Sequence, residues 1–64
     1  MMVNGKAVQV DNAATVSQLL VNLGFAGKRV AVEKNGEIVP KSQHENTAIA
    51  ATDKIEIVVA VGGG

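Results

Sequence analysis

Residues 15–24 read Thr-Val-Ser-Gln-Leu-Leu-Val-Asn-Leu-Gly, and this stretch organises the rest of the chain. Its apolar side chains recur at the spacing of one helix face: Val16, Leu19, Leu20 and Leu23. Thr15 precedes that face and Gln18 lies three residues later, as in a capping box. Gly24 follows the last leucine, where a left-handed helix cap favours glycine. The stretch therefore predicts one helix with a single apolar face that needs a partner layer.

Short strands are predicted before this helix. Residues 1–4 and 6–10 are apolar-rich runs joined by Asn4-Gly5, a pair that favours a two-residue hairpin because a type I′ turn needs positive φ at both positions. By strand alternation, Val8 and Val10 share one face of the second run. We therefore expect the chain to begin with a hairpin.

The alternating pattern of side chains that is typical of strands returns after the helix. Residues 29–34 and 37–39 are joined by a second Asn-Gly pair, and Pro40 should end the shorter strand because it has no amide hydrogen. Residues 41–53 are polar and predict a loop with one helical turn. Residues 55–61 are apolar on one face and half apolar on the other, which is typical of a central strand.

These elements predict an α+β fold in which a mixed sheet of four or five strands packs on one main helix. The predicted domain covers residues 1–61, and residues 62–64 form a separate glycine tail that should be mobile. No linker, repeat or second domain is visible in the sequence.

Composition excludes several classes of function. The chain has 64 residues, six acids, six bases and no cysteine, so it has no disulfide, thiolate metal site or cysteine nucleophile. Zero net charge argues against binding nucleic acid, and no apolar run approaches the roughly 18 residues of a membrane span. We expect a cytoplasmic domain that binds no metal, membrane or nucleic acid.

The tail Gly62-Gly63-Gly64 carries one reactive group, the terminal carboxylate of Gly64. Three glycines reach roughly 10 Å and form a thread without side chains that can enter a narrow cleft. A carboxylate needs activation before it can act as an acyl donor, and the chain lacks both GxxxxGK[ST] and GxGxxG phosphate motifs. A partner must supply the activation, so the chain is predicted to be a protein substrate, not an enzyme with catalytic residues. The alternative is that the glycines are only a disordered end, although their position directly after a central strand favours the carrier interpretation.

Other residues support more than one interpretation. His44 is the lone histidine and is expected to be a solvated loop residue, with a metal ligand or a base as the alternative. Asp11 and Asp53 are expected to be turn or capping groups, with acid–base catalysts as the alternative. The pair Lys28-Arg29 is expected to be a solvated strand start, with an acidic partner as the alternative.

An apolar patch is predicted beside the tail. Val58 and Ala60 share one face of the last strand, and Val61 lies at the root of the tail. They either form an exposed surface for docking a partner or, in the case of Val58 and Ala60, pack under the 41–53 loop.

The whole chain resembles a known family. The resemblance is carried by the Met-x-Val-Asn-Gly start, the helix opening from Thr15 to Leu20, the segment Ala-Val-Glu-Lys-Asn-Gly-Glu-Ile-Val-Pro over 31–40, and the stretch from Asp53 to the glycine terminus. These features are similar to the ThiS family, the sulfur carriers of thiamine thiazole synthesis. Ala51-Thr52-Asp53 departs from the family, which often has Gly before this Asp, but the departure affects only a turn.

The resemblance implies a ubiquitin-like β-grasp fold and a chemistry. A ThiF-like adenylating enzyme, using ATP and magnesium, would adenylate Gly64. Sulfur from a cysteine desulfurase would convert it to a thiocarboxylate, and a ThiG-like thiazole synthase would accept the sulfur. The chain itself would bind no cofactor. Two alternatives stay open: a MoaD-like carrier for molybdopterin synthesis, and a β-grasp interaction module that never carries sulfur.

Overall fold

The predicted helix is present in the computed structural model as α1, Val16–Asn22. Thr15 is its N-cap, and the Oγ1 atom of Thr15 accepts a hydrogen bond from the backbone N–H of Gln18 at 3.3 Å. The Gln18 side chain reaches back, where its Oε1 accepts from the backbone N–H of Ala14 at 2.7 Å. Gly24 has a φ of +83°, the left-handed conformation that ends many helices. Both helix ends therefore confirm the prediction from sequence.

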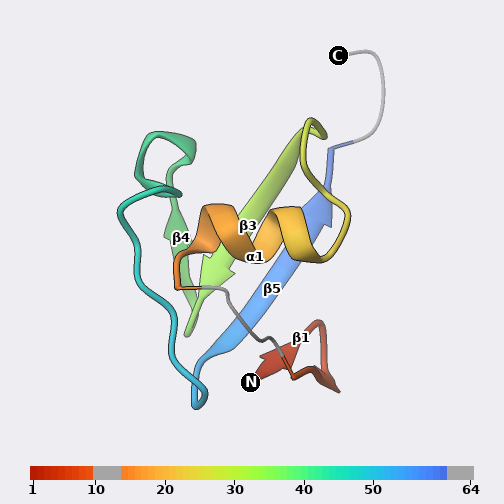
Figure 1. The fold of residues 1–64 in the computed structure, drawn as a ribbon, viewed down its shortest axis with the longest axis vertical. Helices are drawn as coiled ribbons and strands as arrows, with labels where there is room; N and C mark the ends of the chain where they lie inside the picture. Colours follow the sequence, from red (N-terminus) through yellow and green to blue (C-terminus); the bar gives the residue numbers. More distant parts are fainter. Residues whose placement is uncertain (10–13, 61–64) are drawn as a thin grey trace.

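The structure describes residues 1–9 and 14–60, and in these ranges five strands form one mixed sheet with α1 lying across one face (Figure 1). The strands are β1 (Met2–Val3), β2 (Lys6–Ala7), β3 (Val30–Lys34), β4 (Glu37–Val39) and β5 (Lys54–Val59). Their order is β2-β1-β5-β3-β4, in which β1 and β5 are parallel and the other neighbours are antiparallel. The last strand is central, as the sequence predicts.

Two tight hairpins fix the register of the sheet. Asn4 and Gly5 have φ values of +52° and +81°, and Asn35 and Gly36 have +52° and +86°. Positive φ at both positions is the signature of the type I′ turn. The flanking residues pair directly, Val3 with Lys6 and Lys34 with Glu37. The Asn-Gly prediction is confirmed at both sites.

The second strand is shorter than predicted. It ends at Ala7, although the backbone N–H of Val8 donates to the carbonyl of Met1 at 2.8 Å and extends the pairing by one residue. Val10 and Asp11 lie outside the described residues, and so does the predicted boundary between domain and tail.

The core lies between α1 and the facing side of the sheet. Its buried members are Val3, Val16, Leu19, Leu20, Val32, Val39, Ile55 and Ile57. Val8, Leu23 and Val30 are partly buried and pack against this cluster. A continuous aliphatic core is what an unstapled domain of this size requires, because it buries only about 60% of its unfolded surface.

The 41–53 segment closes the N-terminal end of α1. It begins with one 3-10 turn, η1 (Lys41–Gln43), as predicted, and then runs beside the helix start. The carbonyl of Thr47 accepts from the N–H of Val16 at 3.0 Å, and the carbonyl of His44 accepts from the N–H of Ser17 at 2.9 Å. The first N–H groups of a helix have no partner within the helix, so this loop satisfies two of them.

The prediction that His44 is solvated is wrong. His44 is only 8% exposed, and its Nε2 lies 3.1 Å from the carbonyl oxygen of Val39. Because a carbonyl can only accept, Nε2 carries the proton of this hydrogen bond. The loop folds onto the helix start to supply carbonyls, and this packing buries the imidazole.

Candidate functional site

The candidate site is the C-terminal end of β5, from which the chain continues into the tail. Val61, Gly62, Gly63 and Gly64 lie outside the described residues, so the structure shows only the base of the tail. There the backbone N–H of Ala60 donates to the carbonyl of Arg29 at 2.8 Å. This bond holds the last described residue against the segment that leads into β3.

The face of the sheet opposite α1 is open at this end. Register pairs Ala31 with Val58 and Glu33 with both Glu56 and Ile38, and directly paired residues project from the same face. We call these five residues the outer sheet face. Val58 is 61% exposed and Ile38 is 65% exposed, and Ala31 and Glu56 are also exposed.

The exposure of Val58 and Ala60 distinguishes between the two interpretations of these residues. Both residues are exposed, so neither packs under the 41–53 loop. Exposed apolar side chains rimmed by charge are typical of interaction surfaces. The exposure of Val58 and Ala60 is confirmed, Val61 lies outside the described residues, and a role of these residues in docking stays a prediction.

Two carboxylates face each other in the middle of this surface. Glu33 on β3 and Glu56 on β5 are direct cross-strand partners. Like charges placed directly opposite destabilise a sheet, so this pairing is not explained by stability. Strand alternation places Glu56 on the same face as Val58, but sequence reasoning missed Ala31, Glu33 and Ile38, because only the pairing register reveals which residues of β3 and β4 lie beside Val58.

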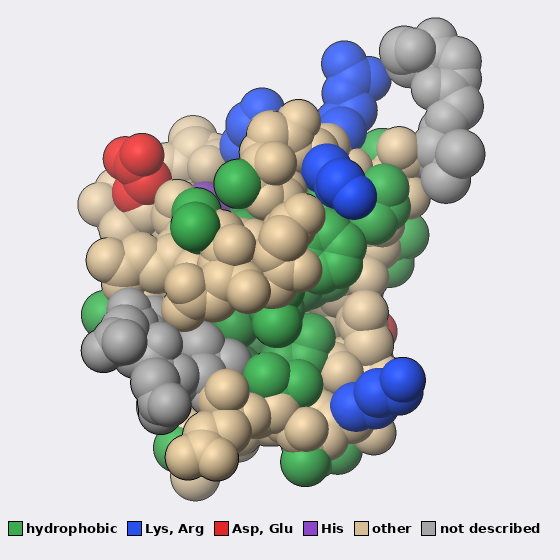
Figure 2. All heavy atoms as spheres, turned by 45° about the vertical axis from the view of Figure 1, so that its right-hand side comes forward, with side chains coloured by type: hydrophobic (Ala, Val, Ile, Leu, Met, Phe, Trp, Pro, Cys, Tyr) green, Lys and Arg blue, Asp and Glu red, His purple; other side chains and the backbone are tan. Residues whose placement is uncertain are grey.

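The basic pair Lys28-Arg29 lies in the segment that connects α1 to β3. Both residues are exposed and stand just before the first strand residue, as predicted. Figure 2 shows Lys and Arg side chains gathered at the upper end of the molecule, above a band of hydrophobic side chains. The sequence did not reveal that Lys41, distant in the chain, joins this basic pair around the same hollow.

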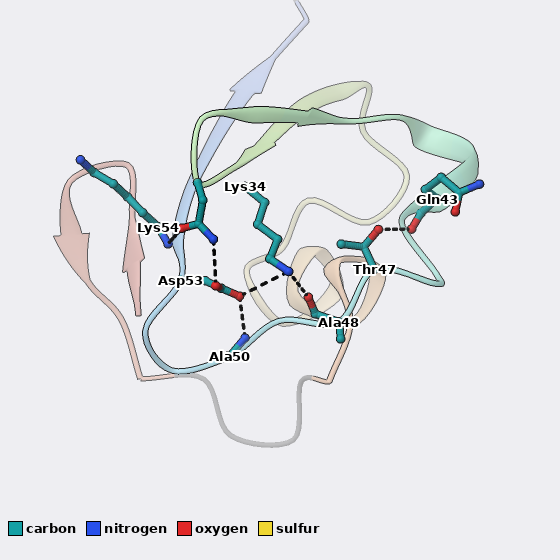
Figure 3. Close-up of polar contacts among 8 residues, drawn as sticks. Lys34, Gln43, Thr47, Ala48, Ala50, Asp53 and Lys54 are labelled. Atoms are coloured by element: carbon teal, nitrogen blue, oxygen red, sulfur yellow. Dashed lines mark hydrogen bonds and ion pairs between the residues drawn. The ribbon is translucent and has the colours of Figure 1, made fainter.

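Asp53 is a turn residue at the opposite end of β5, as predicted (Figure 3). Its Oδ2 accepts from the N–H of Ala50 at 2.7 Å, and its Oδ1 accepts from the side-chain amide of Asn35 at 3.0 Å. The Lys34 ammonium lies 3.8 Å from Oδ2. These contacts, with Asn35 contributing most, lower the pKa of Asp53 below its ordinary value. The carboxylate ties the β3–β4 turn to the start of β5.

Metal binding has no visible basis in the part of the chain that the structure describes. Across residues 1–9 and 14–60 there is no group of three His, Cys, Asp or Glu side chains that could hold an ion. Nor does either helical segment of these ranges have the length and hydropathy needed to cross a membrane.

Comparison with known proteins places the whole chain in one family. Residues 1–64 match the model of the ThiS family. The chain is 37% identical over 65 residues to the sulfur carrier protein ThiS of Bacillus subtilis, and the match covers 100% of this chain and 98% of that protein. The crystal structure of a thiamine biosynthesis protein (ThiS) from Geobacter metallireducens is similar with a TM-score of 0.82 at 36% identity, covering 98% of this chain and 96% of that one.

A longer relative contains a similar module. The chain is 44% identical over 64 residues to a thiazole synthase of Paramagnetospirillum magneticum, a match that covers 100% of this chain and 20% of that protein. The chain therefore spans about a fifth of the length of that synthase. The structural neighbour confirms the expected mixed sheet on one helix, the ubiquitin-like β-grasp fold.

Proposed function

The chain belongs to the ThiS family, and from this premise we propose that it is a sulfur carrier for thiamine thiazole synthesis whose working group is the carboxylate of Gly64. The observation that carries the proposal is the match over residues 1–64, which includes the glycine tail as well as the folded domain. In this role the chain is a substrate of partner enzymes and contributes no catalytic side chain.

The chemistry needs two steps: activation of the Gly64 carboxylate, and then replacement of the activating group by sulfur at the acyl carbon. A carboxylate oxygen of Gly64 attacks the α-phosphorus of ATP, which releases pyrophosphate and forms an acyl adenylate. The terminal sulfur of a persulfide then attacks the acyl carbon and expels AMP, giving an acyl disulfide. A thiol of the sulfur-transfer machinery cleaves the S–S bond, is itself oxidised to a disulfide, and leaves the thiocarboxylate on Gly64.

Partners supply everything except the acyl group. We assign ATP and magnesium to a ThiF-like adenylating enzyme, the persulfide to a cysteine desulfurase, and sulfur acceptance to a ThiG-like thiazole synthase. The thiazole synthase of Paramagnetospirillum magneticum supports the last assignment, because a module 44% identical to this chain occupies about a fifth of it. In that protein the carrier-like module and the rest of the synthase belong to one polypeptide.

The fold suits this role because it presents the tail from a fixed base. The chain enters the tail from the central strand β5, whose last described residue is hydrogen-bonded to Arg29. We propose that Gly62 and Gly63 thread the carboxylate into the partner while Val58 of the outer sheet face, together with Ala60 and Val61, docks against it. Exposed apolar residues near the base of the tail are well placed to anchor the partner, because burial of apolar surface is the dominant favourable term in most protein–protein association.

The test is the intact mass of the chain after incubation with ATP, magnesium, the adenylating enzyme of the same organism and a persulfide source. The expected result is replacement of one oxygen by sulfur, followed by loss of that sulfur when thiazole synthase and its other substrates are added. A mass that never changes with any of these components would remove the sulfur-carrier proposal.

A further inference from the structure

A groove on the helix side of the molecule combines positive charge with an apolar floor. It lies between α1, the connection to β3, and η1, and it measures about 390 Å³. That volume falls within the range of about 300–1,000 Å³ typical of sites that enclose a ligand. Leu20, Phe25 and Val30 line the groove and are buried or half-buried, so they form the apolar part of its floor, beside Ser17 and the buried His44.

Three cations stand around this floor. Lys28, Arg29 and Lys41 line the groove and are all exposed, whereas none of its lining residues is Asp or Glu. They are three of the six basic residues of a chain whose net charge is zero. Among the residues that the structure describes, the ion pair found is Lys34–Asp53, and none involves these three cations.

The groove stands at the base of the tail. Arg29 lines it with its side chain, and its carbonyl accepts the hydrogen bond from the N–H of Ala60 at 2.8 Å. A protein that contacts the chain at the end of β5 would therefore approach Arg29, one of these cations. Three like charges concentrated at one place repel one another, so an acidic partner surface would relieve repulsion that the free chain must tolerate.

We propose that this basic groove docks an acidic segment of the adenylating enzyme, with one large apolar side chain of that segment seated on Leu20, Phe25 and Val30. The inference rests on the proposed function and adds a second docking surface to it. In the proposed cycle the adenylating enzyme meets the carrier as a diffusing chain without net charge. Positive charge concentrated beside the tail would steer that encounter and orient the tail.

Charge reversal at matched positions tests the proposal. Lys28→Glu, Arg29→Glu and Lys41→Glu each change the net charge by the same amount as Lys6→Glu, an exposed control on β2 that does not line the groove. Pyrophosphate release by the adenylating enzyme is measured against carrier concentration at several salt concentrations. Circular dichroism and melting temperature show that each variant is folded, as expected for exposed side chains.

The groove variants should raise KM at least about 10-fold at low salt and leave kcat nearly unchanged, because the charges steer encounter and do not touch the reacting atoms. Added salt should raise the KM of the wild type toward that of the variants, because it screens the charges. If the groove variants stay within about twofold of Lys6→Glu, the groove does not dock the enzyme. A wild-type chain that is never adenylated would instead overturn the sulfur-carrier proposal itself, and this inference with it.

Zero-length cross-linking identifies the occupant directly. A carbodiimide joins an amine to a carboxylate only where the two groups are in contact. Lys28 and Lys41 should therefore couple to Asp or Glu of the adenylating enzyme, and Lys6 should not. Three results contradict the assignment: cross-links between two copies of this chain, groove variants impaired only in sulfur transfer to thiazole synthase, or amide shifts at the groove with inorganic phosphate alone while adenylation kinetics are unchanged.

Discussion

Asp53 connects parts of the chain that are distant in sequence. Its carboxylate accepts hydrogen bonds from Asn35 of the second hairpin and from the backbone of Ala50, with Lys34 nearby. These contacts stabilise the charged form, so the folded-state pKa of Asp53 lies below its ordinary value of 3.8. The stabilisation is thus fully present above pH 3.8 and is lost as the pH falls through the folded pKa.

We expect Asp53→Asn to lower the free energy of unfolding at pH 7 by about 1–3 kcal/mol, because it places an amide donor against donors that need an acceptor. The deficit relative to wild type should shrink below pH 3.8, as the wild-type carboxyl becomes protonated and loses the same contacts. Urea denaturation at pH 7, 5, 3 and 2 measures this. Glu45→Gln, an exposed change outside the network, is the control, and a deficit that stays constant from pH 7 to 2 would show that charge is not the cause.

Asp53 and His44 differ in how far their roles can be predicted from the sequence. The turn role of Asp53 could be predicted, because an aspartate before a strand commonly bonds nearby backbone amides. The burial of His44 could not, because it depends on the Val39 carbonyl and on the helix start at Ser17, which the fold alone brings together. A lone histidine in a polar segment carries no local signal for either contact.

At the scale of elements, α1 is a short helix that depends on what it packs against. Seven residues are too few for a stable isolated helix, since isolated helices shorter than about 12–15 residues are marginal in water. Tertiary contacts compensate: Leu19 is fully buried against the sheet, and the 41–53 loop satisfies the first N–H groups of the helix.

Leu19→Ala should cost about 2–5 kcal/mol, the usual range for opening a cavity at a buried leucine. That is a large part of the 5–15 kcal/mol stability of a typical domain. Val21→Ala, on the exposed side of the same helix, should change stability by less than about 0.5 kcal/mol. Thermal and urea unfolding measure both variants, and similar values for the two would contradict the observed packing.

Local signals predicted the elements well because each one acts over a few residues. The two Asn-Gly turns, the Thr15 cap and the Gly24 end were all readable, and they lie at the end of β1, the start of β2, both ends of α1, the end of β3 and the start of β4. The parallel pairing of β1 with β5 and the cross-strand neighbours of Val58 were not readable, because they join residues far apart in the chain. The sequence therefore predicted only the part of the outer sheet face that lies on the last strand.

Val58→Asp should weaken binding to the adenylating enzyme or to thiazole synthase by about 10-fold or more while the fold is retained. Val58 is 61% exposed, so the aspartate is solvated in the free chain but would be buried without a partner in a complex. Thr52→Asp adds the same charge at the other end of β5 and serves as the control. Binding is measured by calorimetry, and a folded Val58→Asp chain that binds both enzymes like the control would show that the outer sheet face does not dock them.

At the scale of the whole molecule, charge and apolar surface are distributed unevenly around the end of β5. The outer sheet face carries Glu33 and Glu56 beside Val58, and the helix side carries the basic groove. A chain with zero net charge thus has three of its six bases around one groove on the helix side of the sheet, while two of its six acids pair on the other side. Such an arrangement can orient the molecule as it approaches a partner, because the local field acts where net charge does not.

The reaction of the tail can be tested separately from the stability of the fold. Gly62, Gly63 and Gly64 have no side chains to bury, so deleting Gly64 should leave the melting temperature nearly unchanged. The deletion should abolish adenylation, because the new carboxylate at Gly63 stops about 3.5 Å short, and even 1 Å of misplacement can cost roughly 100-fold in rate. Gly63→Val should likewise spare the fold and block the reaction, since a β-branched side chain stiffens and widens the thread. Intact mass after the complete reaction measures each variant, and a Gly64 deletion converted as efficiently as the full chain would show that Gly64 is not the sulfur acceptor.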